Sequence, residues 1–237
     1  MITTDDFLGG RVKLRQSKAG LRATSDSVLV SAAVPAKPGE TVLDVGLGNG
    51  VIALCLNARI SGLKITGIEC QDDLIRLARE NAALNNCDLE VIGADITQKP
   101  SPIHGHQFHH VVTNPPFYDE PHHRQNQQVA KAYHQEISLT EWLSFCLRHV
   151  RAKGTLTVIT RPESLTEVLA VLSEKLGHIE IIPIVSKAGE AAKRIIVRGV
   201  MNSRSPLILR APLMMHLKSG KRSAVAEKIL RHGESIE

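Results

Sequence analysis

Short apolar runs alternate with longer segments of helical spacing through the middle of the chain. The apolar runs cover residues 41–45, 64–69, 89–93, 109–113 and 155–160. The segments of helical spacing cover residues 51–59, 72–84, 139–150 and 163–176, the last followed by Gly177 as a helix stop. Such alternation predicts a parallel sheet with helices on both faces. Two later apolar runs, 179–185 and 194–200, are joined by a polar loop containing glycine and are expected to pair antiparallel.

The composition favours a folded globular protein and excludes several other classes. Of 237 residues, 43% are hydrophobic and 22% are charged, which is typical of soluble domains and excludes disorder of the whole chain. No apolar run approaches the ~20 residues of a membrane helix, and the first residues do not resemble a signal peptide. The four cysteines form no CxxC pair, so we expect no zinc ribbon or redox motif and a reducing, cytoplasmic compartment.

The charge of the chain is mildly basic. A formal net charge of +5 suits a polyanionic partner such as RNA but does not require one. One basic stretch lies near the start, with Lys13, Arg15, Lys18 and Arg22, and a second near the end of the sheet, with Lys187, Lys193, Arg194 and Arg198. A third follows in the last 37 residues, with Arg204, Arg210, Lys218, Lys221, Arg222, Lys228 and Arg231. Each stretch is equally consistent with a solvated basic face.

A glycine-rich loop follows the first strand of the predicted sheet. Gly46, Gly48 and Gly50 stand between a strand and a helix, where small residues permit a tight turn and the close approach of a ligand. Glu69 ends the second strand about twenty residues later, the position of a carboxylate that accepts hydrogen bonds from ribose hydroxyls. The G-x-G-x-G spacing fits a nucleoside cofactor without pyrophosphate, namely S-adenosylmethionine. Asp44, inside the strand, is expected to bond the backbone of this loop.

The most specific motif is Asn114-Pro115-Pro116-Phe117, directly after the fourth strand. Two prolines end a central strand and make a rigid turn. The Asn114 side-chain oxygen and the Pro115 carbonyl are two acceptors that can hold both hydrogens of a planar –NH2 group, while Phe117 offers a face for stacking. Held in this way, an exocyclic amine can attack a sulfonium methyl without a strong base, because positioning and electrostatics lower the barrier.

Together these motifs resemble class I S-adenosylmethionine-dependent methyltransferases of the subset with an (N/D/S)-P-P-(Y/F/W) motif. The resemblance covers roughly residues 24 to 200 and implies a Rossmann-like α/β sheet of seven strands, mostly parallel with an antiparallel last strand. It also implies an acceptor that is a planar conjugated nitrogen: adenine N6, cytosine N4, guanine N2 or a glutamine amide.

A narrower resemblance rests on further residues. Asp6-Phe7-Leu8-Gly9-Gly10, Gln16, Gly20-Leu21-Arg22-Ala23 and Asp26-Ser27-Val28-Leu29 are similar to the bacterial tRNA1(Val) (adenine-N6)-methyltransferase family, as are Arg161-Pro162-Glu163 and the stretch from Gly189 to Arg194. That family modifies an adenine in a tRNA anticodon loop. The resemblance implies cofactor contacts from Asp26, Asp44, Gly46, Gly48, Gly50, Glu69, Cys70, Asp95 and Asn114, and contacts to the target base from Asn114, Pro115 and Phe117.

The resulting interpretation divides the chain into three parts. Residues 1–35 are expected to be an extension packed on the core, residues 36–200 the methyltransferase domain and residues 201–237 a basic C-terminal extension. The expected activity is methylation of adenine N6 in structured RNA, with tRNA favoured. The alternatives are a glutamine amide in a protein, another RNA base nitrogen, an inactive RNA-binding fold and, disfavoured by the loop spacing, a nicotinamide-dependent oxidoreductase. No membrane partner is expected, and a monomer is slightly favoured.

Two segments invite other interpretations. Histidines 104, 106, 109 and 110 have spacing that suits a metal, but we expect a solvated loop and no metal, since no carboxylate or cysteine stands close in sequence. Residues 119–136 form a long polar insert after the fourth strand, as functional loops often do. His122, His123, Arg124, Lys131 and His134 in that insert could contact RNA phosphates.

Overall fold

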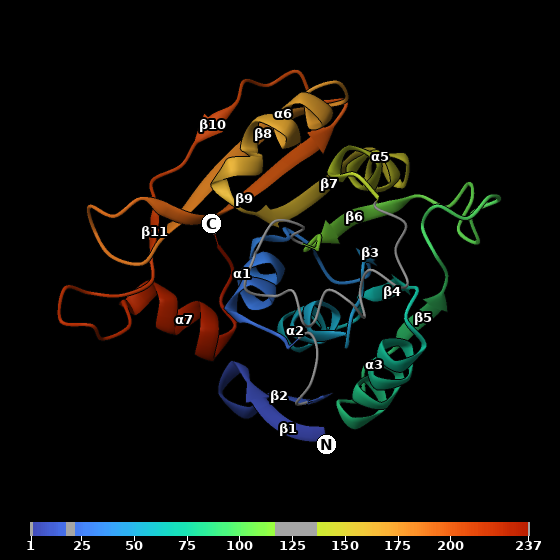
Figure 1. The fold of residues 1–237 in the computed structure, drawn as a ribbon, viewed down its shortest axis with the longest axis horizontal. Helices are drawn as coiled ribbons and strands as arrows, with labels where there is room; N and C mark the ends of the chain where they lie inside the picture. The colour runs from blue at the N-terminus through green and yellow to red at the C-terminus, as the bar shows by residue number, and fades with distance from the viewer. Residues whose placement is uncertain (1, 18–21, 117–136, 237) are drawn as a thin grey trace.

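The computed structural model describes residues 2–17, 22–116 and 137–236, which surround one central twisted sheet (Figure 1). The strands of this sheet lie in the order β10-β8-β9-β7-β6-β3-β4-β5, and β11 also pairs with β8. Their bounds are β3 (Thr41–Val45), β4 (Lys64–Glu69), β5 (Leu89–Gly93), β6 (Phe108–Thr113), β7 (Val150–Thr160), β8 (Leu176–Val185), β9 (Ala192–Met201), β10 (Ile208–Leu209) and β11 (Leu213–Met214). The two short strands extend a core of seven.

Strand direction follows the sequence prediction. The strands β3, β4, β5, β6 and β7 pair in parallel. β9 pairs antiparallel with both β7 and β8, so β8 again runs in the direction of the first five. The carboxyl ends of all strands except β9 therefore lie at one edge of the sheet. The mostly parallel sheet with an antiparallel last strand is confirmed.

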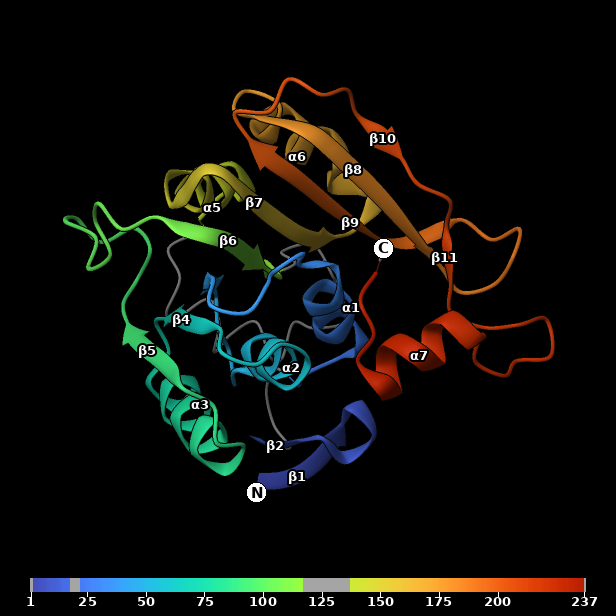
Figure 2. The ribbon, with the colours of Figure 1, turned by 180° about the vertical axis from the view of Figure 1, so that it is seen from behind.

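Helices cover both faces of the sheet (Figures 1 and 2). On one face Val42, Ile65 and Val112 form a core with α1 (Ser25–Ala33), α2 (Val51–Arg59) and α3 (Asp72–Leu84). On the other, Leu43 and Val111 form a second core with α5 (Leu139–Arg148) and α6 (Leu165–Leu172). Because strand side chains alternate between faces, a strand buried on both sides reads as a continuous apolar run. Apolar runs of this kind in the sequence predicted these strands.

The helix predicted over 163–176 is shorter than expected. A 3-10 turn (Pro162–Ser164) precedes α6, which ends at Leu172, and Leu176 and Gly177 already belong to β8, where Gly177 pairs with Val200. Gly177 therefore does not stop the helix. A Cβ there would lie 2.3 Å from the carbonyl oxygen of Ser203, so the glycine is needed because another backbone segment passes close by.

The first and last segments of the chain pack against each other and onto the core. A hairpin of β1 (Ile2–Phe7) and β2 (Val12–Ser17), joined by the 3-10 turn η1 (Leu8–Gly10), lies beside α7 (Ala224–His232) (Figures 1 and 2). The Arg11 guanidinium donates to the His232 carbonyl at 2.9 Å, and Ile236 N–H donates to the Ala32 carbonyl at 2.9 Å. No helix or strand was predicted for either segment. The predicted boundaries between the three parts of the chain stay predictions.

Within the described residues, no helix combines the length and apolarity needed to cross a membrane.

Candidate active site at the carboxyl edge of the sheet

Four loops carry the predicted site residues to one edge of the sheet. Residues 46–50 follow β3, Glu69 ends β4, Asp95 follows β5 and Asn114 follows β6. These strands are parallel and adjacent in the order β6-β3-β4-β5, so their carboxyl ends lie side by side. Ligands of open α/β sheets bind at this edge. The structure therefore brings together the glycine loop, both acids and the Asn-Pro motif.

The glycine loop is a tight turn whose three glycines have different surroundings. All three have positive φ angles: 74° at Gly46, 60° at Gly48 and 89° at Gly50. A Cβ on Gly46 would lie 2.8 Å from Cζ2 of Trp142, so this glycine admits the indole ring. A Cβ on Gly48 would meet no atom within 4 Å, so this side of the loop is open. Gly50 is the N-cap of α2, and its left-handed conformation starts that helix.

Glu69 holds the glycine loop from the neighbouring strand. Its side chain is only 6% exposed, and Oε2 accepts a hydrogen bond of 2.9 Å from the Gly48 N–H. The other oxygen, Oε1, accepts from the N–H groups of Cys70 at 2.9 Å and Gln71 at 3.0 Å. The carboxylate is thus fixed at the rim of the loop. Burial, together with the charges of Glu69 and Asp95, raises the pKa of the Cys70 thiol to about 12, so this thiol stays protonated at neutral pH.

Asp44 is buried beneath the same loop. Its side chain is 0% exposed, and within the described residues neither carboxylate oxygen has a hydrogen-bond partner. Burial raises the pKa of Asp44 well above its usual range, the charge of Glu69 adds to the increase, and the nearby Ala53 N–H opposes it. The expectation that Asp44 bonds the loop backbone is wrong. Glu69 on the neighbouring strand accepts the loop N–H instead, at Gly48.

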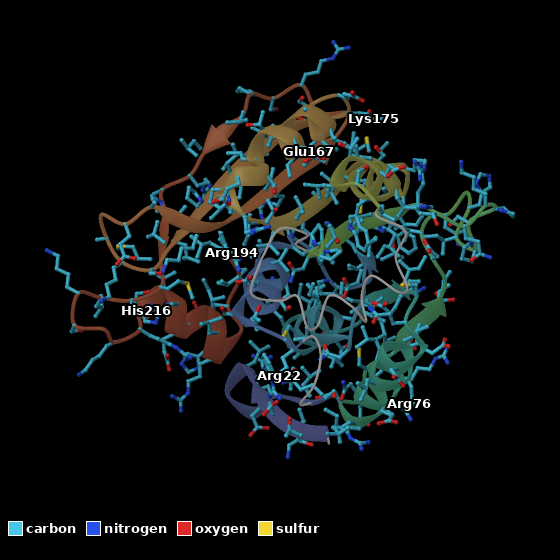
Figure 3. The ribbon with its side chains drawn as sticks, viewed as in Figure 1. Arg22, Arg76, Glu167, Lys175, Arg194 and His216 are labelled. Atoms are coloured by element: carbon cyan, nitrogen blue, oxygen red, sulfur yellow. The ribbon has the colours of Figure 1, made fainter. Side chains whose placement is uncertain are left out.

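Asp95 and Asp26 both have partners of their own. One oxygen of Asp95 accepts hydrogen bonds of 2.8 Å from the N–H and the hydroxyl of Thr97, which makes it a turn cap. Asp26, in the first turn of α1, accepts a bond of 2.7 Å from Nε of Arg194 on β9. Arg194 lies close to α1 in Figure 3. The pair lines a cavity of about 270 Å³ between α1 and the β8–β9 loop.

Asn114 stands at the end of β6 with an unused acceptor. Its side-chain oxygen is buried and has no hydrogen-bond partner among the described residues. Next to it, the Thr113 hydroxyl donates to the Val45 carbonyl at 2.8 Å and accepts from the indole N–H of Trp142 at 2.9 Å. The same indole contacts Gly46, so Trp142 connects the glycine loop with the Asn-Pro motif. Phe117 lies outside the described residues.

Sequence reasoning missed Trp142. It is the single tryptophan of the chain, and it lies on the amphipathic helix α5. Both its partners, Gly46 and Thr113, are at least 29 residues away in sequence. A lone tryptophan on a helix is usually a core residue, so only the fold reveals its role.

Comparison with known proteins decides the family. The family model for the methyltransferase small domain matches residues 23–187. The chain belongs to this family. A protein of Shewanella halifaxensis is 29% identical over 66% of this chain and 65% of its own length, just under two thirds. One of Porphyromonas gingivalis is 28% identical over 76% of each chain. Both relatives are described as tRNA1(Val) (adenine(37)-N6)-methyltransferases.

Solved structures agree with the family assignment. A structure described as a predicted O-methyltransferase from Agrobacterium tumefaciens has a TM-score of 0.74 and 26% identity, and the match covers 89% of this chain and 98% of that one. A 16S rRNA methyltransferase from T. thermophilus, solved with AdoMet and guanosine, shares the fold with a TM-score of 0.58 and 14% identity over 85% of this chain and 50% of that one. The class I fold is thereby confirmed. Methyltransferase activity with S-adenosylmethionine as methyl donor is confirmed by the family model together with the Agrobacterium match.

The residues of the methyltransferase fit this cofactor. The buried Asp44 carboxyl has no hydrogen-bond partner within the described residues, as expected of a group whose partner is a ligand. The side of the loop at Gly48 has space for an atom to approach the backbone. The Glu69 carboxylate is fixed beside that space.

The basic residues of the methyltransferase are partly neutralised by local ion pairs. Near the C-terminal end, Glu180 pairs with Arg198 and Arg210, Glu227 with Arg222 and Arg231, and Glu234 with Lys228. Near the start, Arg15 pairs with Glu80 and Arg22 with Asp5. Figure 3 shows Arg22, Arg76 and Lys175 on separate parts of the molecule. The basic stretches are therefore dispersed. The basic residues of the 119–136 insert lie outside the described residues.

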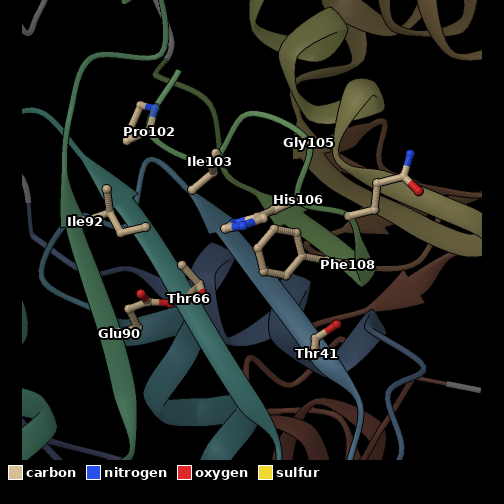
Figure 4. A pocket seen from close by; sticks show the side chains of 10 residues that line it. Thr41, Thr66, Glu90, Ile92, Pro102, Ile103, Gly105, His106 and Phe108 are labelled. Carbon is tan, nitrogen blue, oxygen red and sulfur yellow. Dashed lines mark hydrogen bonds between the residues drawn. The ribbon is translucent and has the colours of Figure 1, made fainter. Parts of the chain in front are cut away.

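A larger cavity lies away from this edge. It has a volume of about 430 Å³ and is lined by Thr41, Glu90 and Phe108 near the amino ends of their strands, together with Ile103 and His106 (Figure 4). The Thr66 hydroxyl donates to Glu90 at 2.9 Å on its wall. None of its lining residues comes from the glycine loop or the Asn-Pro motif, so this cavity is not the cofactor site.

The histidine cluster is dispersed over separate contacts. His109 contacts the Thr41 hydroxyl at 2.8 Å, while His110, on the opposite face, lies 2.8 Å from both Glu40 and Thr155. Burial lowers the pKa of His110 despite its contact with Glu40. His104 and His106 are exposed, as expected, but the solvated-loop interpretation fails for buried His110, whose carboxylate partner is distant in sequence. Across the described residues, no three His, Cys, Asp or Glu side chains gather as metal ligands would.

Proposed function

We propose that this methyltransferase transfers a methyl group from S-adenosylmethionine to the N6 amine of an adenine in structured RNA, with tRNA as the substrate. The two relatives described above support adenine N6 and tRNA. The net charge of +5 is favourable for binding a polyanion. Because tRNA is a cytoplasmic substrate, the cytoplasm is the proposed compartment.

The observation that carries this proposal is the buried, unpartnered oxygen of Asn114. A buried acceptor without a partner is unfavourable by about 1–3 kcal/mol, which a bound N–H donor would remove. The next residue, Pro115, has no N–H and a fixed φ, so it presents its carbonyl from a rigid turn. The two acceptors together match the two hydrogens of an adenine –NH2 group.

These two acceptors act on the reacting nitrogen by position and charge. When both N–H hydrogens are held, the nitrogen lone pair is drawn out of conjugation with the ring and directed at the methyl group. Bound S-adenosylmethionine supplies a sulfonium methyl that is electrophilic without a metal. As the new N–C bond would form, the sulfonium S–CH3 bond would break and the donor would leave as a neutral thioether, so the positive charge would pass to the amine. The neighbouring oxygens would stabilise this charge until a proton is lost to solvent. Phe117 would stack on an adenine turned out of the RNA.

The cofactor residues are proposed by position. Gly46, Gly48 and Gly50 would line the cofactor, with the open side at Gly48 closest to it. Glu69 would bind the ribose hydroxyls and keep its bond to the loop, since each carboxylate oxygen accepts more than one hydrogen bond. The second oxygen of Asp95, beside Cys70, would accept from the adenine amine. Asp44 and Asp26 would lie toward the methionine end.

The direct test is the variant Asn114→Ala. It should reduce methyl transfer to tRNA at least about 100-fold, as loss of an oriented polar group in a transition state does. The affinity for S-adenosylmethionine, measured by calorimetry, should change by less than about threefold. The matched control is Asn85→Ala, an asparagine distant from this edge, which should keep its rate. Full activity in Asn114→Ala would contradict the proposed chemistry.

A further inference from the structure

Asn81 on α3 connects two parts of the molecule that are distant in sequence. Its side chain is 0% exposed. Its oxygen accepts a hydrogen bond of 2.7 Å from the Arg15 N–H, and its –NH2 donates to the Arg15 carbonyl at 2.9 Å. The same –NH2 donates its second hydrogen to the carbonyl of Asn49 at 3.0 Å. Arg15 lies in the N-terminal hairpin and Asn49 in the glycine loop, so one side chain bonds both.

A second asparagine, one helical turn further along, shows what is special about the first. The oxygen of Asn85 accepts from the Lys13 N–H at 2.8 Å, and its –NH2 donates to the Lys13 carbonyl at 2.7 Å and to the Asn81 carbonyl at 2.7 Å. Asn81 and Asn85 thus bind alternate residues of β2, as a neighbouring strand would. Both hold the hairpin against α3, but only Asn81 reaches the glycine loop.

The loop depends on such contacts because its own sequence restrains it poorly. Three glycines in five residues make many backbone conformations accessible, and the observed one leaves the open side at Gly48 next to Glu69. The first two residues of the loop, Gly46 and Leu47, donate their N–H groups to the Ile68 carbonyl at 3.0 Å, so the residues after them depend most on side-chain contacts. Glu69 bonds the loop at the Gly48 N–H, and Asn81 bonds it at the Asn49 carbonyl. These two bonds attach neighbouring residues of the loop to β4 and α3.

The hairpin holds a second segment at the same edge. Gln16, on β2 and 2% exposed, accepts a hydrogen bond of 2.9 Å from the Ala23 N–H through its side-chain oxygen. Ala23 precedes Thr24, the N-cap of α1, and Asp26 lies in the first turn of that helix. The hairpin is therefore bonded both to the glycine loop, through Asn81, and to the chain that leads into α1.

We propose that Asn81 is a positioning residue for S-adenosylmethionine, which holds the glycine loop in its binding conformation by anchoring it to the N-terminal hairpin. This rests on the proposed placement of the cofactor at that loop. The hydrogen bond from the Asn81 –NH2 to the loop carbonyl is already present in the protein before the cofactor binds. Its loss lets the free loop populate other conformations, which weakens binding and leaves the transfer step of the bound complex nearly unchanged.

The test compares two matched substitutions in the full chain, Asn81→Asp and Asn85→Asp. Each keeps the acceptor for a hairpin N–H and removes the donors, but only the first removes the bond to the loop. For Asn81→Asp we expect the Kd and KM for S-adenosylmethionine to rise about tenfold, with kcat at saturating cofactor within about twofold. Asn85→Asp should lower the midpoint of thermal unfolding and leave both constants within about twofold. Equal changes in the two variants, or an unchanged Kd in folded Asn81→Asp, would overturn the proposal.

Two further variants keep the test decisive. If Asn81→Asp does not fold, the neutral Asn81→Ser is measured in its place, with the exchange rate of the Gly50 amide as a second readout. That amide should exchange faster than in Asn85→Ser, and equal rates would overturn the proposal. Gly48→Ala tests the underlying site: its Cβ projects into the open side of the loop and should abolish cofactor binding. Normal binding by Gly48→Ala would show that the cofactor site was misplaced, whatever Asn81 does.

Discussion

At the scale of single residues, the candidate site contains polar side chains whose oxygens are buried without a hydrogen-bond partner. Asp44 and Asn114 are the two such acceptors at the carboxyl edge of the sheet within the described residues. Burying a polar group without a hydrogen bond destabilises the fold, and the proposed ligand contacts would offset this loss of stability. Their effect on the free protein is therefore measurable as well as their effect on activity.

Asp44→Asn should change how the stability of the cofactor-free protein depends on pH. The folded pKa of Asp44 is raised above the unfolded value near 3.8, so the folded state binds the proton more tightly. Stability from this group is complete below pH 3.8 and declines as pH rises toward the folded pKa, by up to about 1.4 kcal/mol per pH unit. The free energy of unfolding should be measured with urea at pH 5, 6 and 7. At each step the value for the variant should rise relative to the value for the natural protein. A difference that is constant with pH would contradict the burial of an unpartnered carboxyl.

The residue roles differ in how far the sequence could predict them. The positions of Glu69 and Asn114 are predictable because Glu69 ends a strand and Asn114 directly follows one, and parallel strands deliver such residues to one edge. The expected hydrogen bond of Asp44 to the loop was wrong, because the Gly48 N–H donates to Glu69 on the neighbouring strand. Trp142 and Asn81 carry no local signal, because their partners are distant in sequence and only the tertiary fold selects them.

At the scale of elements, α5 supports the site through the contact of its indole with the first glycine of the loop. A capping box between Ser138 and Glu141 fixes the start of this helix directly before Trp142. The indole then contacts Gly46 and donates to Thr113. The loop after β3 and the end of β6 are thereby packed around one aromatic side chain.

Gly46→Ala should therefore destabilise the protein more than Gly39→Ala. Both glycines have positive φ, 74° and 85°, so each alanine incurs about 1–2 kcal/mol of backbone strain. Only at position 46 would the new Cβ collide with Trp142, at 2.8 Å, which adds about 1–3 kcal/mol. Chemical denaturation of the two variants measures the difference. Equal losses would show that the indole moves aside freely and does not hold the loop.

Element boundaries were predictable where both faces of a strand are buried. The strand ranges 41–45 and 64–69 agree with the structure because all their residues but the first are buried. The helix ranges 51–59 and 72–84 agree through their helical spacing, and the strand range 89–93 agrees although none of its residues is fully buried. The hairpin β1–β2 was missed, since Thr3, Asp5 and Lys13 in it are typical of loops and its pairing with α3 depends on asparagine side chains. The helix over 163–176 was too long because Gly177 serves a backbone contact and not a helix end.

At the scale of the whole molecule, the charge is dispersed and partly paired, so RNA binding is expected to be modest and sensitive to salt. Lys187 and Lys193 lie in the β8–β9 region, at the same edge as Asn114. Surface ion pairs such as those of Glu227 are weak, so the paired arginines can still contribute to the field around the molecule.

Raising the salt concentration should change the KM for tRNA much more than the KM for S-adenosylmethionine. Between 50 and 200 mM salt, the KM for tRNA is expected to rise about tenfold, which corresponds to two or three phosphate contacts. The reason is that the release of counterions from the RNA favours binding less at the higher salt concentration. The KM for S-adenosylmethionine should change by less than about twofold, since this small ligand has no phosphates whose counterions are released on binding. Steady-state kinetics with each substrate in turn measures both. An unchanged KM for tRNA would argue against an RNA substrate held by its phosphates.

The central claim is the acceptor of the methyl group. The most direct measurement is transfer from labelled S-adenosylmethionine to total tRNA and, separately, to total cell protein, with the RNA digested to nucleosides and identified by mass. The account predicts label in tRNA as N6-methyladenosine and its absence with Asn114→Ala. Label in a protein band as methylglutamine, or in another RNA nucleoside such as N2-methylguanosine, would contradict the proposed substrate.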